Sequence, residues 1–299
     1  MAPGERAPVC VVVGDLCVDV AARLHEPLAF GSDAAASISL GGGGSAANVA
    51  AWLASAGVAT VLIGRVGDDR AGSRERDRLE RLGVRTRLAR DPEAATGTVI
   101  AVVGADGERT MLTDRGASAW LSAEDLPADA FATADHLHLS GYTLLHETSR
   151  QGGLEALRLA RQAGLTVSVD PSSHAPLRAV GRERFLSWTQ DTELCLLNAD
   201  EARVLAGTED LDEALERLAA TYREVVVTLG ARGARWRGAQ GSALVPAGSA
   251  AVRDTTGAGD AFRAGFLAVW LTGGSPRVAL SGGADLAARA VETVGARPQ

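Results

Sequence analysis

The sequence contains no lysine, because all 30 of its basic residues are arginine. This absence excludes mechanisms that depend on a lysine amine, including a Walker-A phosphate loop, a Schiff-base enzyme and a pyridoxal-phosphate enzyme. Acidic residues are in excess, with 37 Asp and Glu and a formal net charge of -7. A basic surface for nucleic acid is therefore not expected. A small anionic ligand would be held by local groups rather than by the overall field.

Cysteines and long apolar runs are also scarce. Cys10, Cys17 and Cys195 form no Cys-x-x-Cys pair, so we expect free buried thiols rather than a disulfide framework or a zinc ribbon. The apolar run at 9–13 is too short for the core of a signal peptide, and no run has the length of a transmembrane helix. We therefore expect a cytoplasmic protein that does not bind membranes.

The remaining pattern indicates an α/β fold. Hydrophobic residues make up 46% of the 299 residues, which is enough for a sizeable core. β-Branched runs alternate with helical segments, and this predicts a doubly wound, mostly parallel sheet flanked by helices. We expect strands at 9–13, 58–63, 135–139, 165–169, 194–197 and 224–229, and helices at 45–56, 70–82, 147–163, 199–206, 210–220, 257–272 and 275–294.

Two segments interrupt this alternation. Residues 96–114 read as a hairpin around the turn Ala105-Asp106-Gly107, because Asp-Gly between apolar runs favours a hairpin turn. Residues 16–40 lack helix periodicity and suit short strands off the main sheet. We expect a single domain over 1–299, with a small β-sheet lid drawn from these two segments. A further hairpin is expected at 234–245.

Residues 40–50, "LGGGGSAANVA", are spelled like a flexible linker. A linker is disfavoured because the glycines lead directly into a segment of helical composition. A dinucleotide-binding loop is disfavoured because the first strand lies far upstream and no acidic residue follows the next strand. The remaining interpretation is that the glycines let a substrate approach bare backbone N–H groups. Asn48, one turn into the helix, would then bind a hydroxyl.

The strongest local signal is "DTTGAGDAFRAGF", residues 254–266. Small residues at 257–259 let consecutive N–H groups point outward at the start of a helix, which makes an anion site. Such a site suits the charge that develops on a transferring phosphoryl group. Asp260, in the first turn, would accept the proton of a hydroxyl. The alternative is that Asp260 only caps the helix.

Two further stretches carry polar groups at the ends of predicted strands. Asn198 and Glu201 lie three residues apart at a helix start, where they can serve Mg²⁺ directly or through water; a simple helix cap fits the same pattern. The run 225–233 is a buried strand that opens into a glycine turn, a place where α/β sheets bind ligands, although a plain tight turn fits equally. His136 and His138 share a strand face without a third ligand, so we expect a structural role.

Together these stretches resemble the PfkB, or ribokinase-like, family of carbohydrate kinases. "GGGGSAANVAAWLASAG" is similar to the N-terminal signature of that family, and "DTTGAGDAFRAGF" to its C-terminal signature. "GRVGDDRAG", "NADEARVLAG" and "VTLGARGA" follow the family's order between them. The resemblance spans nearly the whole chain. It implies a ribokinase-like fold and an ATP-dependent sugar kinase that uses Mg²⁺.

The resemblance also implies roles for residues on the nucleotide side. Asp260 would be the catalytic base, and the N–H groups of Gly257, Ala258 and Gly259 would form the anion hole. Asn198 and Glu201 would position Mg²⁺ near the phosphates of ATP. The residues that would line the nucleotide site are Thr228, Gly230 and Gly233. Those that match a monovalent-cation site, K⁺ in some relatives, are Asp254 and Thr256.

On the acceptor side, the resemblance implies contacts from both signatures and from the lid. Asp19 would bind a sugar hydroxyl. The other implied acceptor-site residues are Gly43, Gly44, Asn48, Thr98 and Arg109. Arg109 would be the partner of a carboxylate on the sugar, if the sugar carries one. The lid also builds a dimer interface in many members, so we expect a homodimer.

The acceptor itself stays open. Residues 140–142, Ser-Gly-Tyr, stand where ribokinases carry an acidic residue, which counts against ribose. A nucleoside or pseudouridine kinase is the alternative enzyme, although aromatic residues, which would stack on a base, make up only 4% of the chain. Tyr142 and Trp120 are the candidate platforms. A non-catalytic sensor of sugar or nucleotide is a third interpretation, and a nicotinamide oxidoreductase a more distant one.

Overall fold

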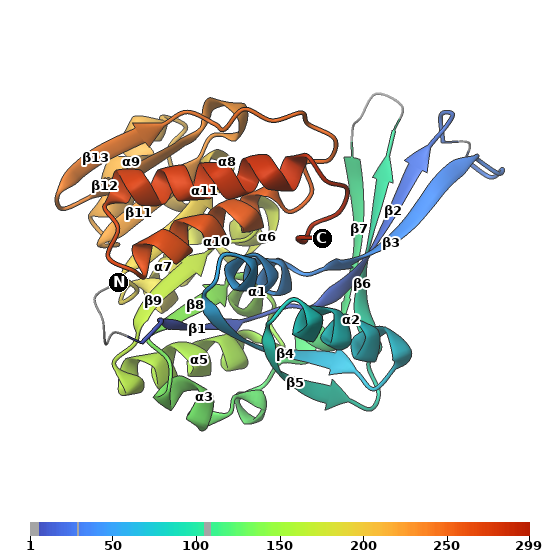
Figure 1. The fold of residues 1–299 in the computed structure, drawn as a ribbon, viewed down its shortest axis with the longest axis horizontal. Coiled ribbons are helices and arrows are strands. Elements are labelled where there is room, and N and C mark those ends of the chain that lie inside the picture. Colours follow the sequence, from blue (N-terminus) through green and yellow to red (C-terminus); the bar gives the residue numbers. More distant parts are fainter. Residues whose placement is uncertain (1–5, 29, 105–108) are drawn as a thin grey trace.

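The computed structural model describes residues 6–28, 30–104 and 109–299. A large sheet carries helices on both faces, and a small sheet stands to one side (Figure 1). The strands of the large sheet are β1 (Val9–Val13), β4 (Ala59–Gly67), β5 (Arg85–Asp91), β8 (His136–Ser140), β9 (Thr166–Asp170), β10 (Leu194–Asn198), β11 (Glu224–Thr228), β12 (Ala234–Gly238) and β13 (Gly241–Val245). Those of the small sheet are β2 (Cys17–Leu24), β3 (Ala36–Gly43), β6 (Thr96–Val103) and β7 (Arg109–Gly116).

The helices fill the connections between these strands. They are α1 (Ser45–Ser55), α2 (Arg70–Arg81), α3 (Ala128–Ala132), α4 (Tyr142–Leu145), α5 (Arg150–Ala163), α6 (His174–Val180), α7 (Arg182–Thr189), α8 (Ala199–Ala206), α9 (Leu211–Ala219), α10 (Ala258–Trp270) and α11 (Pro276–Val291). Short 3-10 turns lie at Ala117–Trp120, Ala123–Asp125 and Gly230–Arg232.

The strand order of the large sheet is β13-β12-β11-β10-β9-β8-β1-β4-β5. From β11 to β5 every neighbouring pair is parallel, and β12 and β13 add an antiparallel edge. The chain builds outward from β1 to β5 and then returns to add β8 on the other side of β1. This reversal between β1 and β8 is the switch point at which open α/β sheets bind ligands, outside the carboxyl ends of the strands.

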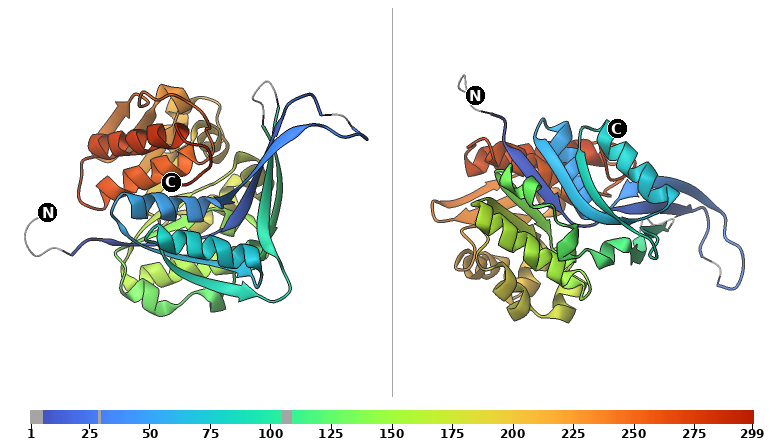
Figure 2. Two further views of the ribbon diagram at one scale, coloured as in Figure 1. Left: turned by 45° about the vertical axis from the view of Figure 1, so that its right-hand side comes forward. Right: turned by 90° about the horizontal axis from the view of Figure 1, so that it is seen from below.

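Alternate residues of the buried strands supply two apolar cores. Cys10 and Val12 of β1 face the core beneath α1, α2, α10 and α11. Val11 and Val13 face the core beneath α3 and the helices from α5 to α9. Both views in Figure 2 show the sheet between these two helix layers. Burial on both faces explains why the strands read as continuous hydrophobic runs rather than as alternating ones.

The small sheet has the order β3-β2-β6-β7. Its residues come from the two segments that the sequence set apart from the main alternation. The cross-strand row of Leu40, Val20, Ile100 and Leu112 lies on one face, and Leu40, Ile100 and Leu112 are exposed on it. Successive residues of a strand face opposite sides, so Asp19 and its partner Val99 lie on the other face.

The predicted fold class is confirmed, and the predicted strands and long helices are found within a few residues of their expected bounds. Strand β5 was not predicted, because its sequence, RTRLARD, alternates charge with small or apolar residues at the edge of the sheet. Helices α6 and α7 were not predicted either. The turn expected at 105–107 lies outside the described residues. Within the described ranges, no helix combines the length and the apolar character needed to cross a membrane.

Candidate active site

Polar residues gather at the carboxyl edge of the large sheet, on both sides of the switch point. Asp15 is the second residue after β1, Ser140 ends β8 and Asp170 ends β9. The N-termini of α1 and α10 are directed at the same edge, since Ser45 and Asp260 are in hydrogen-bond contact. The two signature stretches, more than 200 residues apart in sequence, therefore meet at one place.

The glycines of the opening signature belong to β3 and to the start of α1. Gly43 is the last residue of β3, and any side chain there would collide with the carboxylate of Asp19. Gly44 has a φ of 90°, which glycine adopts without strain. The carboxylate of Asp15 accepts hydrogen bonds from the N–H groups of Ser45 and Ala46, both at 3.2 Å, and thus caps α1 from another segment. The linker interpretation is wrong, because this stretch is paired, capped and largely buried.

Asp260 lies where the two signatures meet. Its Oδ1 accepts hydrogen bonds from Ser45 Oγ at 2.9 Å and from Arg263 Nη1 at 3.1 Å, and its Oδ2 accepts one from Asn48 Nδ2 at 2.9 Å. Burial raises the pKa of Asp260 to about 6, and Arg263 limits the rise. Gly257 precedes α10 with a φ of 75°, and Asp260 lies in the first turn of that helix. Its hydrogen bonds to Ser45 and Asn48 go beyond what a helix cap requires.

Arg263 holds several buried acids together. Besides its contact with Asp260, its Nη2 lies 3.7 Å from Asp170 and 4.0 Å from Glu201. Burial disfavours the charged guanidinium, but these carboxylates outweigh it, and the pKa of Arg263 is raised. Asp170 is fully buried, and its pKa is nevertheless lowered by Arg263 and His138. The guanidinium of Arg263 thus lies within 4.0 Å of three carboxylates.

Asn198 and Glu201 form a capping box at the start of α8. Asn198 Nδ2 donates to Glu201 Oε1 at 2.7 Å, and the N–H of Asn198 donates to Oε2 at 2.8 Å. Burial raises the pKa of Glu201 to about 7, against the effect of Arg263. Because both carboxylate oxygens already accept hydrogen bonds, these residues fit a cation held through water better than one bound directly.

The glycine turn after β11 has a structural explanation. Gly230 and Gly233 have φ values of 61° and 95°, and a side chain at Gly233 would collide with the backbone of Val245. Thr228 donates to the carbonyl of Leu197 at 3.3 Å. These residues lie at the same carboxyl edge of the sheet as the rest of the site. The geometry of the turn alone explains why glycine occupies positions 230 and 233.

The predicted acceptor residues are brought together only in part. Asp19 lies against Gly43, and burial raises its pKa to about 6. Thr98 pairs with Val18 and therefore lies on the opposite face of the small sheet from Asp19. Val99 occupies the row of Asp19 instead. The predicted position of the Arg109 side chain lies outside the part of the chain that the structure describes.

The predicted cation ligands are involved in a turn. Asp254 Oδ1 accepts from the N–H and the hydroxyl of Thr256, at 3.0 and 2.7 Å, and Oδ2 accepts from the N–H of Gly295 at 3.0 Å. Elsewhere, His136 and His138 are buried and share the hydroxyl of Ser168, at 2.7 and 2.9 Å. The three cysteines are free and buried, as expected.

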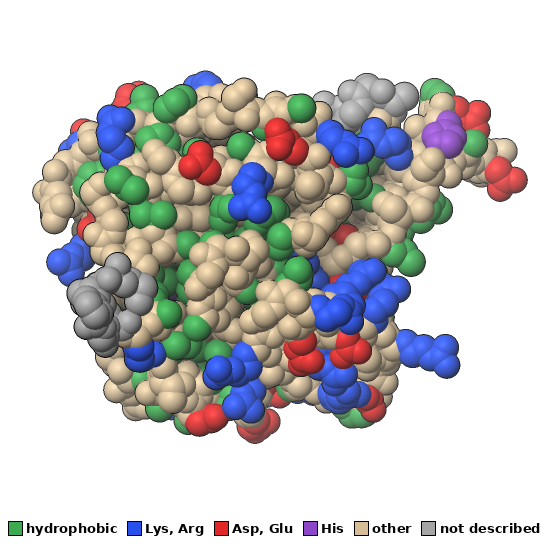
Figure 3. All heavy atoms as spheres, in the orientation of Figure 1, with side chains coloured by type: hydrophobic (Ala, Val, Ile, Leu, Met, Phe, Trp, Pro, Cys, Tyr) green, Lys and Arg blue, Asp and Glu red, His purple; other side chains and the backbone are tan. Residues whose placement is uncertain are grey.

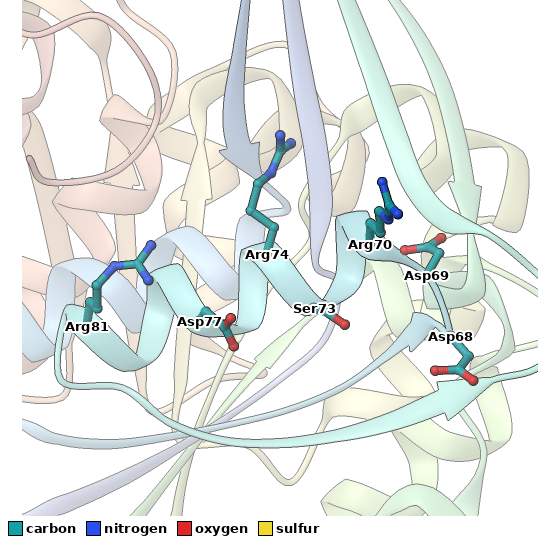
Figure 4. Close-up of a pocket in the computed structure, with 7 residues that line it drawn as sticks. All are labelled: Asp68, Asp69, Arg70, Ser73, Arg74, Asp77 and Arg81. Carbon is teal, nitrogen blue, oxygen red and sulfur yellow. The ribbon is translucent and has the colours of Figure 1, made fainter.

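Two of the surface hollows are lined by residues that the sequence singled out. One, of about 550 Å³, follows α2 and is lined by charged side chains of that helix (Figure 4). Asp69 there caps α2 by accepting a hydrogen bond from the N–H of Gly72 at 2.7 Å. Basic side chains also gather over α2 on the face in Figure 3. The other hollow, of about 680 Å³, is lined in part by Arg115, Trp120 and His146.

Several site residues were not predicted from the sequence. Arg263 was detectable, because it lies three residues after Asp260 on the same helix face. Asp15 was detectable because it follows the first strand. Arg115 lies over the ring of Tyr142, with its guanidinium carbon 3.5 Å from the ring centre, so it covers one candidate stacking surface. Arg297, described below, gave no local signal.

The arrangement can perform one kind of chemistry well. A buried carboxylate with a pKa near 6 accepts a proton from a hydroxyl at neutral pH. The helix start beside it favours an anion. The family model of pfkB family carbohydrate kinases matches residues 8–299. The chain belongs to the PfkB family of carbohydrate kinases. It is therefore a sugar kinase of this family.

Individual PfkB relatives differ in the acceptor that their names give. The chain is 36% identical, over 88% of its length and 84% of the relative, to an ATP-dependent ribose-1-phosphate kinase of Halopiger xanaduensis. It is 34% identical, over 78% of each chain, to a fructokinase of Klebsiella pneumoniae. Its structure matches an adenosine kinase of Sinorhizobium meliloti with a TM-score of 0.88 and 28% identity, covering 98% and 96% of the two chains.

A more distant structure supports the fold alone. A putative ribokinase II of E. coli, in complex with ATP and Mg²⁺, matches with a TM-score of 0.87 and 23% identity, covering 97% of this chain and 94% of that one. ATP binding follows from the family. The acceptor named for these relatives varies, so family membership leaves it open.

The pKa of Asp260 predicts a stability change with pH. Because folding raises this pKa from 3.8 to about 6, the folded chain binds the proton more tightly, and the cost of the ionised carboxylate grows as pH rises through this range. Asp260→Asn should therefore raise the free energy of unfolding by about 1–3 kcal/mol at pH 8, and by less at pH 5. Urea denaturation at both pH values measures the free energy of unfolding, and Asp285→Asn, at an exposed position, is the control. An Asp260→Asn protein less stable at both pH values would contradict this.

Proposed function

We propose that the protein transfers the γ-phosphoryl group of ATP to a hydroxyl of a small sugar or sugar acid, with Asp260 as general base. One observation carries this proposal: the Asp260 carboxylate, at the start of α10, is hydrogen-bonded to Ser45 and Asn48 of the other signature. The carboxylate of Asp260 therefore lies between α1, which would contact the acceptor, and the start of α10, which would bind the phosphoryl group.

In the proposed step, Asp260 takes the proton of the acceptor hydroxyl as its oxygen bonds to the γ-phosphorus. The bond from that phosphorus to the bridging oxygen of ADP breaks, and ADP leaves with the electron pair. The N–H groups of Gly257, Ala258 and Gly259 lie at the start of α10 and would stabilise the negative charge of the transferring group. Asp19 and Asn48 would orient the acceptor.

Magnesium would be held at the nucleotide side. Asn198 and Glu201 would hold it through water, because their own hydrogen bonds occupy both carboxylate oxygens. When bound, Mg²⁺ neutralises charge on the phosphates. Thr228, Gly230 and Gly233 would line the nucleotide. Asp254 and Thr256 remain candidates for a monovalent cation such as K⁺. The buried free thiols suit a reducing compartment, and we assign the enzyme to the cytoplasm.

A nucleoside acceptor is the second candidate. Trp120 is 54% exposed and lines the hollow of about 680 Å³ beside Arg115, where it could stack on a base. We also propose that the small sheet is a lid and that two lids pair. Leu40, Ile100 and Leu112 are 55%, 36% and 53% exposed in one cross-strand row, and no charged residue belongs to that row.

The proposed base is tested with a panel of sugars, sugar acids, sugar phosphates and nucleosides. ADP release should be detected for at least one acceptor, and Asp260→Asn should lower kcat on that acceptor by at least about 100-fold, because proton removal is lost. Asp285→Asn should keep the rate. An Asp260→Asn enzyme with full kcat would overturn the assignment of the base. A nucleoside preferred over every sugar would favour the second candidate.

The lid pairing is tested by charge. Wild-type protein should elute from size exclusion with light scattering at the mass of two chains. The variant Leu40→Glu/Leu112→Glu should have the mass of one chain, since the charges would be buried without partners. The control is Leu244→Glu, which places the same charge on an equally exposed leucine of β13. A wild-type monomer, or a dimer that survives both charges, would contradict the pairing.

A further inference from the structure

The last turn of the chain packs into the active site. Figure 1 shows the C-terminus beside α1, and both views in Figure 2 agree. Residues 295–297, which we call the C-terminal strap, touch both signatures. Trp52 of α1 donates to the carbonyl of Ala296 at 2.9 Å. On the other side, a Cβ at Gly257 would lie 2.5 Å from the same carbonyl oxygen. The strap thus lies between the start of α10 and the helix of the acceptor signature.

Arg297 is the buried end of this strap, with 7% of its side chain exposed. Its guanidinium donates to the carbonyl of Gly43 at 2.6 Å, to Glu75 Oε2 at 3.0 Å and to Asn48 Oδ1 at 3.1 Å. A side chain at Gly42 would occupy the space of the guanidinium. Arg297 therefore links β3, α1 and α2 through hydrogen bonds, and Gly42 leaves the space that its guanidinium fills.

These contacts fix the amide of Asn48. Its oxygen accepts from Arg297, and its nitrogen donates to Asp260 at 2.9 Å. A flipped amide would place its NH₂ group against the guanidinium and its oxygen against the carboxylate, and both contacts would be repulsive. Arg297 thereby selects the orientation in which Asn48 donates to Asp260.

We propose that Arg297 is a positioning residue for phosphoryl transfer, acting through the amide of Asn48 on Asp260 and on the acceptor. The proposal rests on the proposed function, since it takes Asp260 as the base and Asn48 as an acceptor contact. Arg297 does not reach the nucleotide side, where Glu201 and Asp170 contact Arg263 instead. Its loss should therefore affect the acceptor and not ATP.

Arg297 also sets the charge around Asp19. The groups that act on this carboxylate are Arg297 from the strap, Asp260 from α10, Asp15 from the turn after β1 and Glu75 from α2. Arg297 is the cation among them. Burial raises the pKa of Asp19 and Arg297 opposes the rise. Without Arg297, Asp19 would ionise only at higher pH, and binding of an acceptor hydroxyl would be lost earlier on acidification.

The main test compares Arg297→Met with Arg289→Met, an exposed arginine of α11, on the best acceptor. Arg297→Met should lower kcat/KM for the acceptor at least about tenfold and change KM for ATP by less than about twofold. The acidic limb of its plot of kcat/KM for the acceptor against pH should move to higher pH by about 0.5–1 unit. Arg289→Met should match wild type. Unchanged acceptor kinetics and an unmoved acid limb in Arg297→Met would overturn the proposal.

A double-mutant cycle with Asn48→Ala tests the route of the effect. At pH 8, where Asp19 is ionised in both backgrounds, Arg297→Met should change kcat/KM by less than about twofold once Asn48 is absent. Full additivity of the two losses would overturn the proposed route. If Arg297→Met folds poorly because Glu75 Oε2 loses its partner, the double variant Arg297→Met/Glu75→Gln, compared with Glu75→Gln alone, replaces the single variant in both experiments. Failure of the proposed function would show differently, as full activity of Asp260→Asn.

Discussion

The site depends on keeping a buried carboxylate ionised. The general base proposed here must be charged before it can accept a proton, but burial raises the pKa of Asp260 to about 6. Three donors offset this cost: the guanidinium of Arg263, the hydroxyl of Ser45 and the amide of Asn48. The result is a carboxylate that is mostly charged at neutral pH and would still be basic enough to act as the proposed base. Each donor comes from one of the two helix starts, which explains why α1 and α10 must meet.

The same balance extends around Arg263. Its one positive charge lies among Asp170, Glu201 and Asp260. In the proposed function, a divalent cation held near Glu201 would add positive charge beside these carboxylates, and the pKa of Glu201, raised by burial to about 7, would fall in its presence. The proposed metal, rather than a lysine, would then offset the charge of the phosphates.

The sequence predicts the parts of this centre that are local. Asp260, its glycines and the following helix lie in one motif, and the alternation of strands and helices gives the sheet. The face of Thr98, opposite to that of Asp19, could not be predicted, because a strand reverses sides at every residue and a motif match does not determine the pleat. Arg263 needed only helix geometry to be found. Arg297 could not be found, because its partner Asn48 lies 249 residues away and no pattern links them.

Arginine is suited to both of these buried positions. The guanidinium of Arg297 donates in three directions, to a carbonyl, a carboxylate and an amide oxygen, and its planar group holds these partners in fixed relative positions. A lysine would offer three donors around one nitrogen, a geometry that cannot span the same separated partners. The C-terminal strap therefore fixes the orientation of α1 and also places a positive charge beside that helix. The glycine stretch follows from the same geometry, since its small residues make room for Arg297 at Gly42 and for Asp19 at Gly43.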